Sequence, residues 1–231
     1  MTDIAANLAR VNQRIAAAAN KAGRDPGSVK LVAVAKTHPP EAIRLAVQAG
    51  VQIIGENYVQ EARAKMARLA DLEIEWHFIG RLQTNKAKEV IEGFSLIHSL
   101  DRLKLALELD RRAGLKGRRV PVLIEVNLAG EETKGGVAEV EVKDLLKAAA
   151  DCRHLEVRGL MTMPPFFDQP ERARPYFARL RRLAEDLRQA TGLPLPELSM
   201  GMSGDFEAAI VEGATLVRVG TAIFGQRSSS L

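Results

Sequence analysis

The sequence has very little cysteine and few aromatic residues. Cys152 is the one cysteine among 231 residues, so the chain can form neither an intramolecular disulfide nor a cysteine-based metal cluster. This composition is typical of a protein in a reducing compartment, and we expect a cytoplasmic location. Aromatic residues make up 4% of the chain. None lies in the densest basic segment, residues 111–119, where a nucleic-acid-binding surface would use aromatic rings to stack on bases.

The sequence also lacks long hydrophobic runs. No stretch approaches the roughly 18 consecutive apolar residues of a membrane-spanning helix. The N-terminal residues have the pattern of an amphipathic helix and not that of a signal peptide. The net charge is +4, but most basic residues alternate with acidic ones in helical segments, which is typical of solvated helix faces. We therefore expect neither a membrane nor a nucleic acid as a partner.

Short apolar segments alternate with longer helical patterns along the chain. Eight predicted strands cover residues 30–35, 51–55, 75–80, 94–99, 120–127, 156–162, 196–202 and 215–220. Eight strands with helices between them predict an α/β fold, a parallel (β/α)8 TIM barrel. An additional helix precedes the first strand and is expected to close one end of the barrel.

Two absences support this organisation. No G-x-G-x-x-G motif follows any predicted strand, which disfavours the alternative of a doubly wound open sheet. No linker divides the sequence, so residues 1–231 are predicted to form a single domain.

Lys36 follows the apolar run LVAVA at the end of the first predicted strand. Alternation along a strand puts Val32, Val34 and Lys36 on one face, so the ammonium group is expected to point inward. Burial disfavours the charged form of a lysine, and the neutral amine is a nucleophile that forms Schiff bases. The alternative is a structural ion pair with Glu56 or Asp205.

The loops after the last two predicted strands contain small and hydroxyl residues. Ser203 and Gly204 follow the seventh strand, and Gly220 and Thr221 follow the eighth. TIM barrels commonly bind phosphate at these loops, where backbone N–H and hydroxyl groups donate hydrogen bonds. Pyridoxal 5′-phosphate has an aldehyde, which a nucleophilic lysine can bind as a Schiff base, and a phosphate group, which these loops can bind on the same rim. The alternative is that these residues only form turns.

Two residues on the last two strands are further candidates for contacts with the cofactor. Arg218 lies two residues before Gly220 on the same strand face, so it is expected to point into the barrel. A guanidinium group beneath a pyridoxal ring would donate to the pyridine nitrogen and keep it unprotonated. The alternative for Arg218 is a salt bridge to an acid such as Glu125. Met200 is a candidate for packing against the flat ring, and the alternative is that it only packs at the end of its strand.

Four other polar residues are interpreted as structural. His77 and His98 lie on different predicted strands and have no carboxylate at a metal-ligand spacing, so no metal site is expected. Ser99 and Asp101 lie at the end of the fourth predicted strand and are interpreted as helix caps.

Six segments together resemble the pyridoxal-phosphate-binding homeostasis protein family, which is similar to the barrel domain of alanine racemase standing alone. They are VAVAKTHP, IGENYVQEA, WHFIGRLQTNK, GLMTM, LSMGMSGDFEAAI and VRVGTAIFG, and they span nearly the whole chain in the family's order.

The resemblance implies a site at the ends of several strands. Lys36 would form the Schiff base, and the other implied contacts are Ser203, Gly220 and Thr221 to phosphate, Arg218 to the pyridine nitrogen and Asn57 near the ring. Gly204 fills a position that is often acidic in the family, which leaves its own role open. The implied function is to hold and buffer pyridoxal phosphate, with effects on amino-acid and keto-acid balance and with apo-forms of pyridoxal-phosphate enzymes as partners.

The alternative function is a small single-domain amino-acid racemase. A two-base racemase needs one base on each face of the substrate's α-carbon, and Lys36 can serve one face. The sequence has two tyrosines, Tyr58 and Tyr176, and eleven residues after Gly220. Neither tyrosine matches the second-domain tyrosine that supplies the opposite base in alanine racemase. We therefore expect a cofactor carrier without efficient racemase activity.

Overall fold

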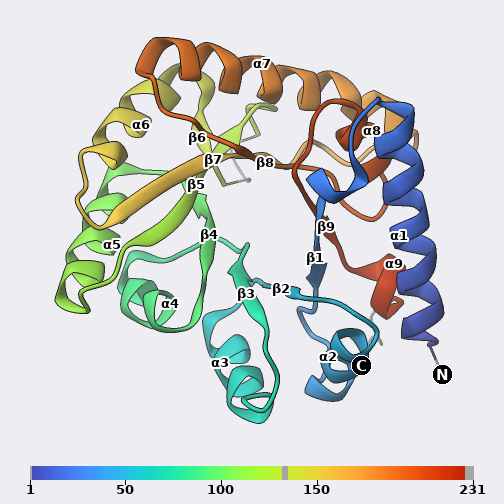
Figure 1. Ribbon diagram of the computed structural model, residues 1–231. Coiled ribbons are helices and arrows are strands. Elements are labelled where there is room, and N and C mark those ends of the chain that lie inside the picture. The colour runs from blue at the N-terminus through green and yellow to red at the C-terminus, as the bar shows by residue number, and fades with distance from the viewer. Residues whose placement is uncertain (1, 132–134, 227–231) are drawn as a thin grey trace.

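Eight parallel strands form a closed barrel in the computed structural model, which describes residues 2–131 and 135–226 (Figure 1). The strands are hydrogen-bonded in the order β4-β3-β2-β1-β9-β8-β7-β5, and a pairing of β4 with β5 closes the ring. They are β1 (Lys30–Val34), β2 (Ile53–Glu56), β3 (Glu75–Phe78), β4 (Leu96–Leu100), β5 (Val120–Asn127), β7 (Leu155–Met161), β8 (Glu197–Ser199) and β9 (Leu216–Val219). A two-residue strand, β6 (Val137–Ala138), pairs with β5 outside the ring. The predicted TIM barrel is confirmed.

Helices surround the strands (Figure 1). They are α1 (Ile4–Lys21), α2 (Pro40–Gln48), α3 (Val59–Arg68), α4 (Ala87–Gly93), α5 (Leu103–Leu115), α6 (Val142–Ala150), α7 (Arg174–Thr191), α8 (Phe206–Val211) and α9 (Thr221–Phe224). Short 3₁₀ turns cover Pro26–Ser28, Thr84–Lys86, Glu139–Glu141 and Pro170–Ala173. The longest helices have typical ends: Asp3 caps α1 by accepting the Ala6 N–H at 2.9 Å, and Gly192 ends α7 with a φ of 71°.

Helix α1 does not close an end of the barrel, contrary to the prediction. It packs in the outer layer against α8, α9 and α2, as Figure 1 shows at the right of the molecule. Its buried face consists of Ile4, Leu8, Val11, Ile15, Ala18 and Ala19. The physical reason is that α8 has six residues and α9 has four, so a longer helix is needed to cover the apolar surface beside them.

Alternation along the strands separates two apolar cores. Val32 belongs to a small cluster inside the barrel, whose other buried members are Ile53, Leu96, Leu123, Met161 and Leu216. Ala33 and Ala35 belong to the larger cluster between the barrel and the helices. The predicted inward face of the first strand is therefore confirmed at Val32. The barrel interior is a packed core and not a pore.

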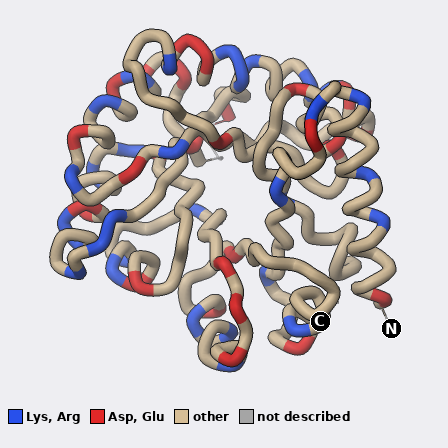
Figure 2. The backbone as a smooth tube through the Cα atoms, in the orientation of Figure 1, with Lys and Arg blue, Asp and Glu red and all other residues tan. Residues whose placement is uncertain are grey.

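Charges of both signs are interspersed over the outer helices (Figure 2). In the basic segment 111–119, Arg111 and Arg112 both pair with Glu108, and Lys116 pairs with Glu92. These ion pairs reduce the positive charge that the segment presents, while the expectation of no nucleic-acid partner stays a prediction. Within the described residues, no helix is both long enough and apolar enough to cross a membrane.

Candidate functional site

The loops after β8 and β9 meet at the carboxyl-terminal rim of the barrel. Ser203 Oγ accepts hydrogen bonds from the N–H groups of Gly220 at 3.2 Å and Ala222 at 3.4 Å. An oxygen atom in front of two backbone N–H groups is the arrangement that a phosphate oxygen needs. A Cβ placed on Gly220 would lie 3.2 Å from the carbonyl oxygen of Val34. These loops therefore also adjoin the end of β1, which carries Lys36.

Two of the other predicted phosphate-loop residues border open space. Thr221 is the first residue of α9 and is exposed. Gly204 is exposed as well, and a Cβ placed there would meet no atom within 4 Å. A bound phosphate group would have room beside both residues.

The turn that carries Lys36 is held on both sides by side chains of α3. Lys65 Nζ donates a hydrogen bond to the carbonyl oxygen of Ala35 at 2.7 Å, and Glu61 Oε1 accepts the N–H of Thr37 at 2.6 Å. Thr37 has a φ of 66°, in the left-handed region that β-branched residues rarely adopt. Lys36 itself is half-buried. We refer to the contacts of Lys65 and Glu61 with this turn as the α3 clamp.

Buried carboxylates support the α3 clamp. Lys65 is 5% exposed, and its ammonium group also donates to Glu56 and Glu61 at 2.7 Å each. Burial raises the pKa of Glu56 to about 7, although the hydrogen bond from Lys65 opposes the shift. Glu56, one of the two alternative partners predicted for Lys36, thus pairs with Lys65. Asp205, the other, accepts the N–H of Met202 at 2.6 Å.

Arg218 points into the barrel and is 3% exposed. Its NH1 group donates to Ser199 Oγ at 2.5 Å, and NH2 donates to the carbonyl oxygen of Thr162 at 2.9 Å. The described residues contain no ion pair between Arg218 and Glu125, which was the predicted alternative. Burial lowers the pKa of Arg218 to about 10, while the charges of Glu125 and Asp205 oppose this shift. The guanidinium group therefore remains charged at neutral pH.

Glu125 is a buried acid near Arg218 that the sequence suggested only as a partner for that arginine. It is 4% exposed and lies two residues after Leu123, which belongs to the interior cluster. Burial, followed by the charge of Asp101, raises the pKa of Glu125 to about 7. An acid within the apolar strand VPVLIEVN is the signal that could have identified it.

A cavity of about 970 Å³ opens beside Asn57, with Tyr58, Arg81 and Asp101 among its lining residues. The Asn57 Oδ1 atom is buried and has no hydrogen-bond partner among the described residues. A Cβ on Gly80 would lie 2.2 Å from the Asn57 carbonyl oxygen, so only glycine permits this close packing. A buried amide oxygen without a partner fits a ligand that donates a hydrogen bond.

Met200 lies away from the other candidates. It is wholly buried in the core between the barrel and the helices, because it follows Ser199, whose side chain faces the interior. This placement does not support the predicted contact with the cofactor ring, and Met200 is not part of the proposed site.

The predicted caps at Ser99 and Asp101 are wrong. Ser99 is 1% exposed within β4, and its Oγ has no hydrogen-bond partner among the described residues. Helix α5 begins only at Leu103, with Arg102 at the cap position and no side-chain cap bond. Asp101 pairs with Arg102 instead. Strand β4 runs through Ser99 to Leu100, so Ser99 lies within the sheet and not at the start of a helix.

The two interior histidines are buried, at 2% exposure for His77 and 0% for His98. Their rings contact each other, with His98 Nε2 3.0 Å from His77 Nδ1. No sequence pattern indicated this contact, because the two residues lie on different strands. Across the described ranges, no group of three or more His, Cys, Asp or Glu residues is arranged to hold a metal ion.

Comparison with known proteins places the chain in a family. The model of the alanine racemase N-terminal domain matches residues 6–228. A pyridoxal phosphate homeostasis protein of Aquifex aeolicus is 50% identical over 220 residues, covering 95% of this chain and 96% of the relative. The chain belongs to the pyridoxal phosphate homeostasis protein family. The resemblance identified from its motifs is confirmed.

Solved structures agree with this assignment. PipY of Synechococcus elongatus, solved with PLP bound, superposes with a TM-score of 0.87 at 40% identity, covering 96% of this chain and 100% of PipY. An alanine racemase of Clostridium difficile superposes with a TM-score of 0.74 at 16% identity, covering 96% of this chain and 57% of the racemase. The second likeness shows the shared barrel fold.

The α3 clamp gives a prediction for stability. Replacing Lys65 with methionine leaves Glu56 buried without its cation, so at pH 8 the free energy of unfolding should fall by about 3–5 kcal/mol. The measurement is urea-induced unfolding. Lys116→Met is the matched control, because Lys116 is half-exposed and its ion pair with Glu92 contributes at most about 1 kcal/mol. Equal unfolding midpoints for the two variants would contradict the clamp.

Proposed function

We propose that this protein binds pyridoxal 5′-phosphate through a Schiff base with Lys36 and holds the cofactor as part of vitamin B6 homeostasis. The observation that carries the proposal is the junction of Ser203, Gly220 and the end of β1. In this junction the N–H group of Gly220, which could donate to a phosphate oxygen, lies next to the end of β1 and so close to the turn that contains Lys36. The names of the relatives and the PLP bound to PipY support the same ligand.

Different residues of the rim contact different groups of the cofactor. Ser203, Thr221 and the N–H of Gly220 bind the phosphate group, and Asn57 Oδ1 accepts a hydrogen bond near the ring. Arg218 donates to the pyridine nitrogen. When bound, pyridoxal phosphate supplies an aldehyde and an electron-withdrawing ring. A charged, donor-only guanidinium keeps the ring nitrogen unprotonated, which weakens the ring as an electron sink. This assignment favours holding the cofactor over rapid chemistry on it.

The proposal extends to the setting of the protein. Residues 1–231 act as one pyridoxal-phosphate-binding domain, although Met1, 132–134 and 227–231 lie outside the described residues. The cytoplasm is the proposed location, since a chain with one cysteine suits a reducing compartment. Apo-forms of pyridoxal-phosphate enzymes are the proposed recipients of the cofactor.

Lys36 should carry the cofactor. Borohydride reduction of the loaded protein should fix the label on Lys36, because the reduced bond to the lysine no longer hydrolyses. Peptide mapping by mass spectrometry locates the label, and Lys36→Ala protein should lose it. Lys30→Ala is the control on the same strand, since Lys30 lies at the opposite end of β1 near Glu197. A label on any other lysine in the wild-type protein would contradict the assignment.

The phosphate contacts should account for much of the affinity. Each charge-assisted hydrogen bond contributes roughly 1.5–3 kcal/mol, so Ser203→Ala/Thr221→Ala protein should bind pyridoxal phosphate at least about tenfold more weakly. Equilibrium titration of the cofactor's absorbance measures this change. Ser28→Ala, at an exposed turn before β1, is a control that should bind as the wild type does. Unchanged affinity in the double variant would exclude these hydroxyl groups from the site.

The alternative function, a single-domain racemase, predicts proton exchange at the substrate's α-carbon. Tyr58 is 60% exposed, and Tyr176 on α7 has its ring 5.9 Å from that of Phe167. We therefore expect α-proton exchange of L- and D-alanine in deuterated water to be far slower than about 1 s⁻¹, the lower end of typical enzymatic rates. NMR of the alanine pool measures the exchange. Turnover at or above that rate would favour the racemase.

A further inference from the structure

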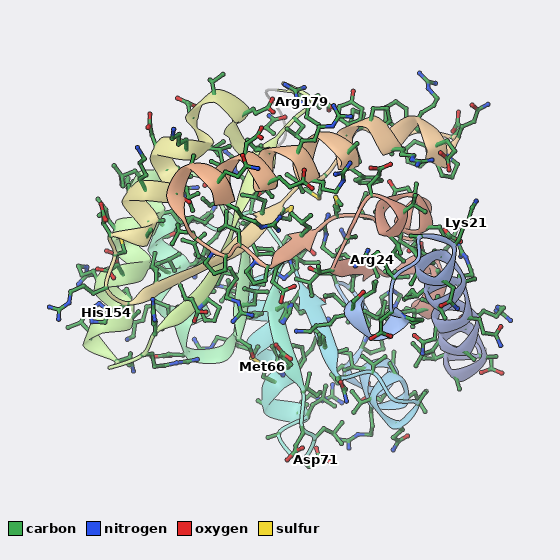
Figure 3. The ribbon with its side chains drawn as sticks, turned by 45° about the horizontal axis from the view of Figure 1, so that its top comes forward. Lys21, Arg24, Met66, Asp71, His154 and Arg179 are labelled. Atoms are coloured by element: carbon green, nitrogen blue, oxygen red, sulfur yellow. The ribbon has the colours of Figure 1, made fainter. Side chains whose placement is uncertain are left out.

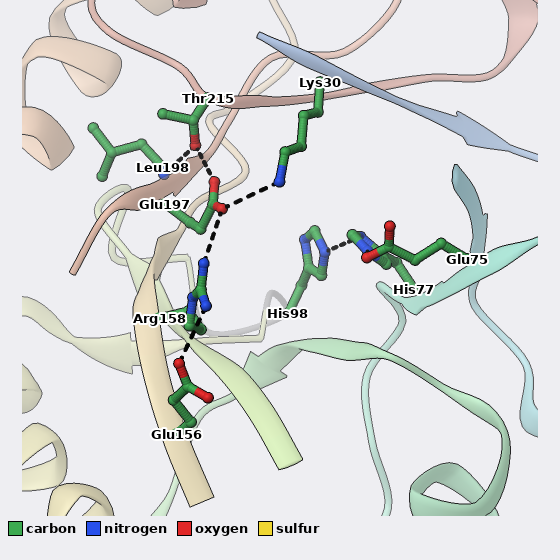
Figure 4. A network of polar contacts seen from close by, with 9 residues as sticks. All are labelled: Lys30, Glu75, His77, His98, Glu156, Arg158, Glu197, Leu198 and Thr215. Carbon is green, nitrogen blue, oxygen red and sulfur yellow. Dashed lines mark hydrogen bonds and ion pairs between the residues drawn. The ribbon is translucent and has the colours of Figure 1, made fainter. Parts of the chain in front are cut away.

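Five polar side chains form a hydrogen-bonded chain across the barrel interior, from Glu75 to Arg218. Glu75 Oε1 lies 3.0 Å from His77 Nε2, and His77 Nδ1 lies 3.0 Å from His98 Nε2. His98 Nδ1 lies 2.8 Å from Ser199 Oγ, which accepts from Arg218 NH1 at 2.5 Å. Figure 4 shows the end of this chain at Glu75, His77 and His98. The contacts join β3, β4, β8 and β9.

The chain runs from the surface to the buried interior. Glu75 begins β3 at the amino-terminal end of the barrel, and its side chain is 52% exposed. The next three residues are all at most 2% exposed: His77, His98 and Ser199. Burial, followed by the charges of His77 and Arg218, lowers the pKa of His98 well below its usual range. His98 is therefore neutral at physiological pH.

The two ends of the chain have fixed roles, because the carboxylate of Glu75 only accepts and the guanidinium group of Arg218 only donates. An ionised carboxylate only accepts, so Glu75 requires the proton of His77 to be on Nε2. With this one proton on the His77 ring, Nδ1 of His77 accepts, and it receives the Nε2–H of His98. Nδ1 of His98 must in turn accept from the hydroxyl of Ser199. That hydroxyl oxygen accepts from Arg218, which only donates.

We propose that Glu75, His77, His98 and Ser199 are positioning residues that hold the guanidinium group of Arg218 through this one-way chain. Ser199 fixes NH1, and the carbonyl oxygen of Thr162 fixes NH2, so the plane of the guanidinium group is set. The chain thereby couples the amino-terminal end of the barrel to a residue of the opposite rim's site. The role toward the cofactor's pyridine nitrogen rests on the proposed function, whereas the chain itself does not.

The first test measures the histidine tautomers in protein without cofactor. Long-range ¹H–¹⁵N correlation of ¹⁵N-histidine-labelled protein should show a proton on Nε2 and none on Nδ1 in both His77 and His98. Glu75→Met should remove this fixed preference at His77, because the accepting carboxylate is gone. His154, which Figure 3 labels at the periphery of the molecule, should keep its signals. A proton on Nδ1 of either interior ring of the wild-type protein would overturn the one-way chain, whether or not pyridoxal phosphate binds.

The second test measures whether the chain acts on the cofactor. Ser199→Ala removes the link to Arg218 and should weaken pyridoxal phosphate binding about five- to tenfold, the effect of losing one hydrogen bond. Glu75→Met should weaken binding in the same direction from the far end of the barrel. Glu156→Met is the matched control, because Glu156 lies at that same end and pairs with Arg158 at 3.1 Å, outside the chain (Figure 4).

The comparison separates positioning from general stability. Wild-type affinity in Glu156→Met with weaker binding in Glu75→Met supports the proposal, since only one of these acids belongs to the chain. Equal affinities for wild type, Glu75→Met and Ser199→Ala, with the predicted tautomers present, would overturn the positioning role. If wild-type protein binds no pyridoxal phosphate, the proposed function and this role both fail, whereas the tautomers still decide whether the chain exists.

Discussion

The ammonium group of Lys65 is the contact on which the geometry at the rim depends. It lies between the barrel and α3, and it joins the carbonyl oxygen of Ala35 to the carboxylates of Glu56 and Glu61. Through these bonds the end of β1, the end of β2 and the first turns of α3 become one rigid unit. The turn with Lys36 is part of that unit, including the left-handed Thr37. An amine that must meet an aldehyde benefits from such preorganisation.

Burying this much charge is costly, and the arrangement offsets the cost with hydrogen bonds. A buried ion pair seldom adds much stability compared with apolar packing, but losing one partner is severe. Glu56 and Glu125 show the same tension, since burial raises the pKa of each to about 7. Glu56 lies between the strands and α3, where it pairs with Lys65, and Glu125 is buried near Arg218. We interpret these buried carboxylates as groups that position the residues of the rim, since apolar side chains would pack there at a lower cost.

Periodicity in the sequence was sufficient to predict the barrel and the inward direction of Arg218. Apolar alternation marks each strand, and Arg218 sits between Val217 and Val219, which both face the outer core. The junction of Ser203 with Gly220 also followed from the general position of phosphate loops in such barrels. The ring contact considered for Met200 did not use this alternation, which continues past β8 and directs Met200 into the outer core.

Contacts between elements could not be predicted in this way. The partner of Glu56 depends on how α3 lies across β1 and β2, which no local pattern encodes. The contact of His77 with His98 depends on the stagger of β3 against β4, where His77 is paired in register with Leu96. The contacts of Ser199 could not be predicted for the same reason, since its partners His98 and Arg218 lie on β4 and β9. Such contacts require the barrel's shear to be known residue by residue.

A crystal structure of the protein with pyridoxal phosphate would test the proposed site most directly. We expect continuous electron density from Lys36 Nζ to the cofactor. We also expect the phosphate group at Ser203 and Gly220, with the ring nitrogen facing Arg218. Cofactor density joined to a different lysine, or a phosphate group outside the loops after β8 and β9, would contradict the proposed site.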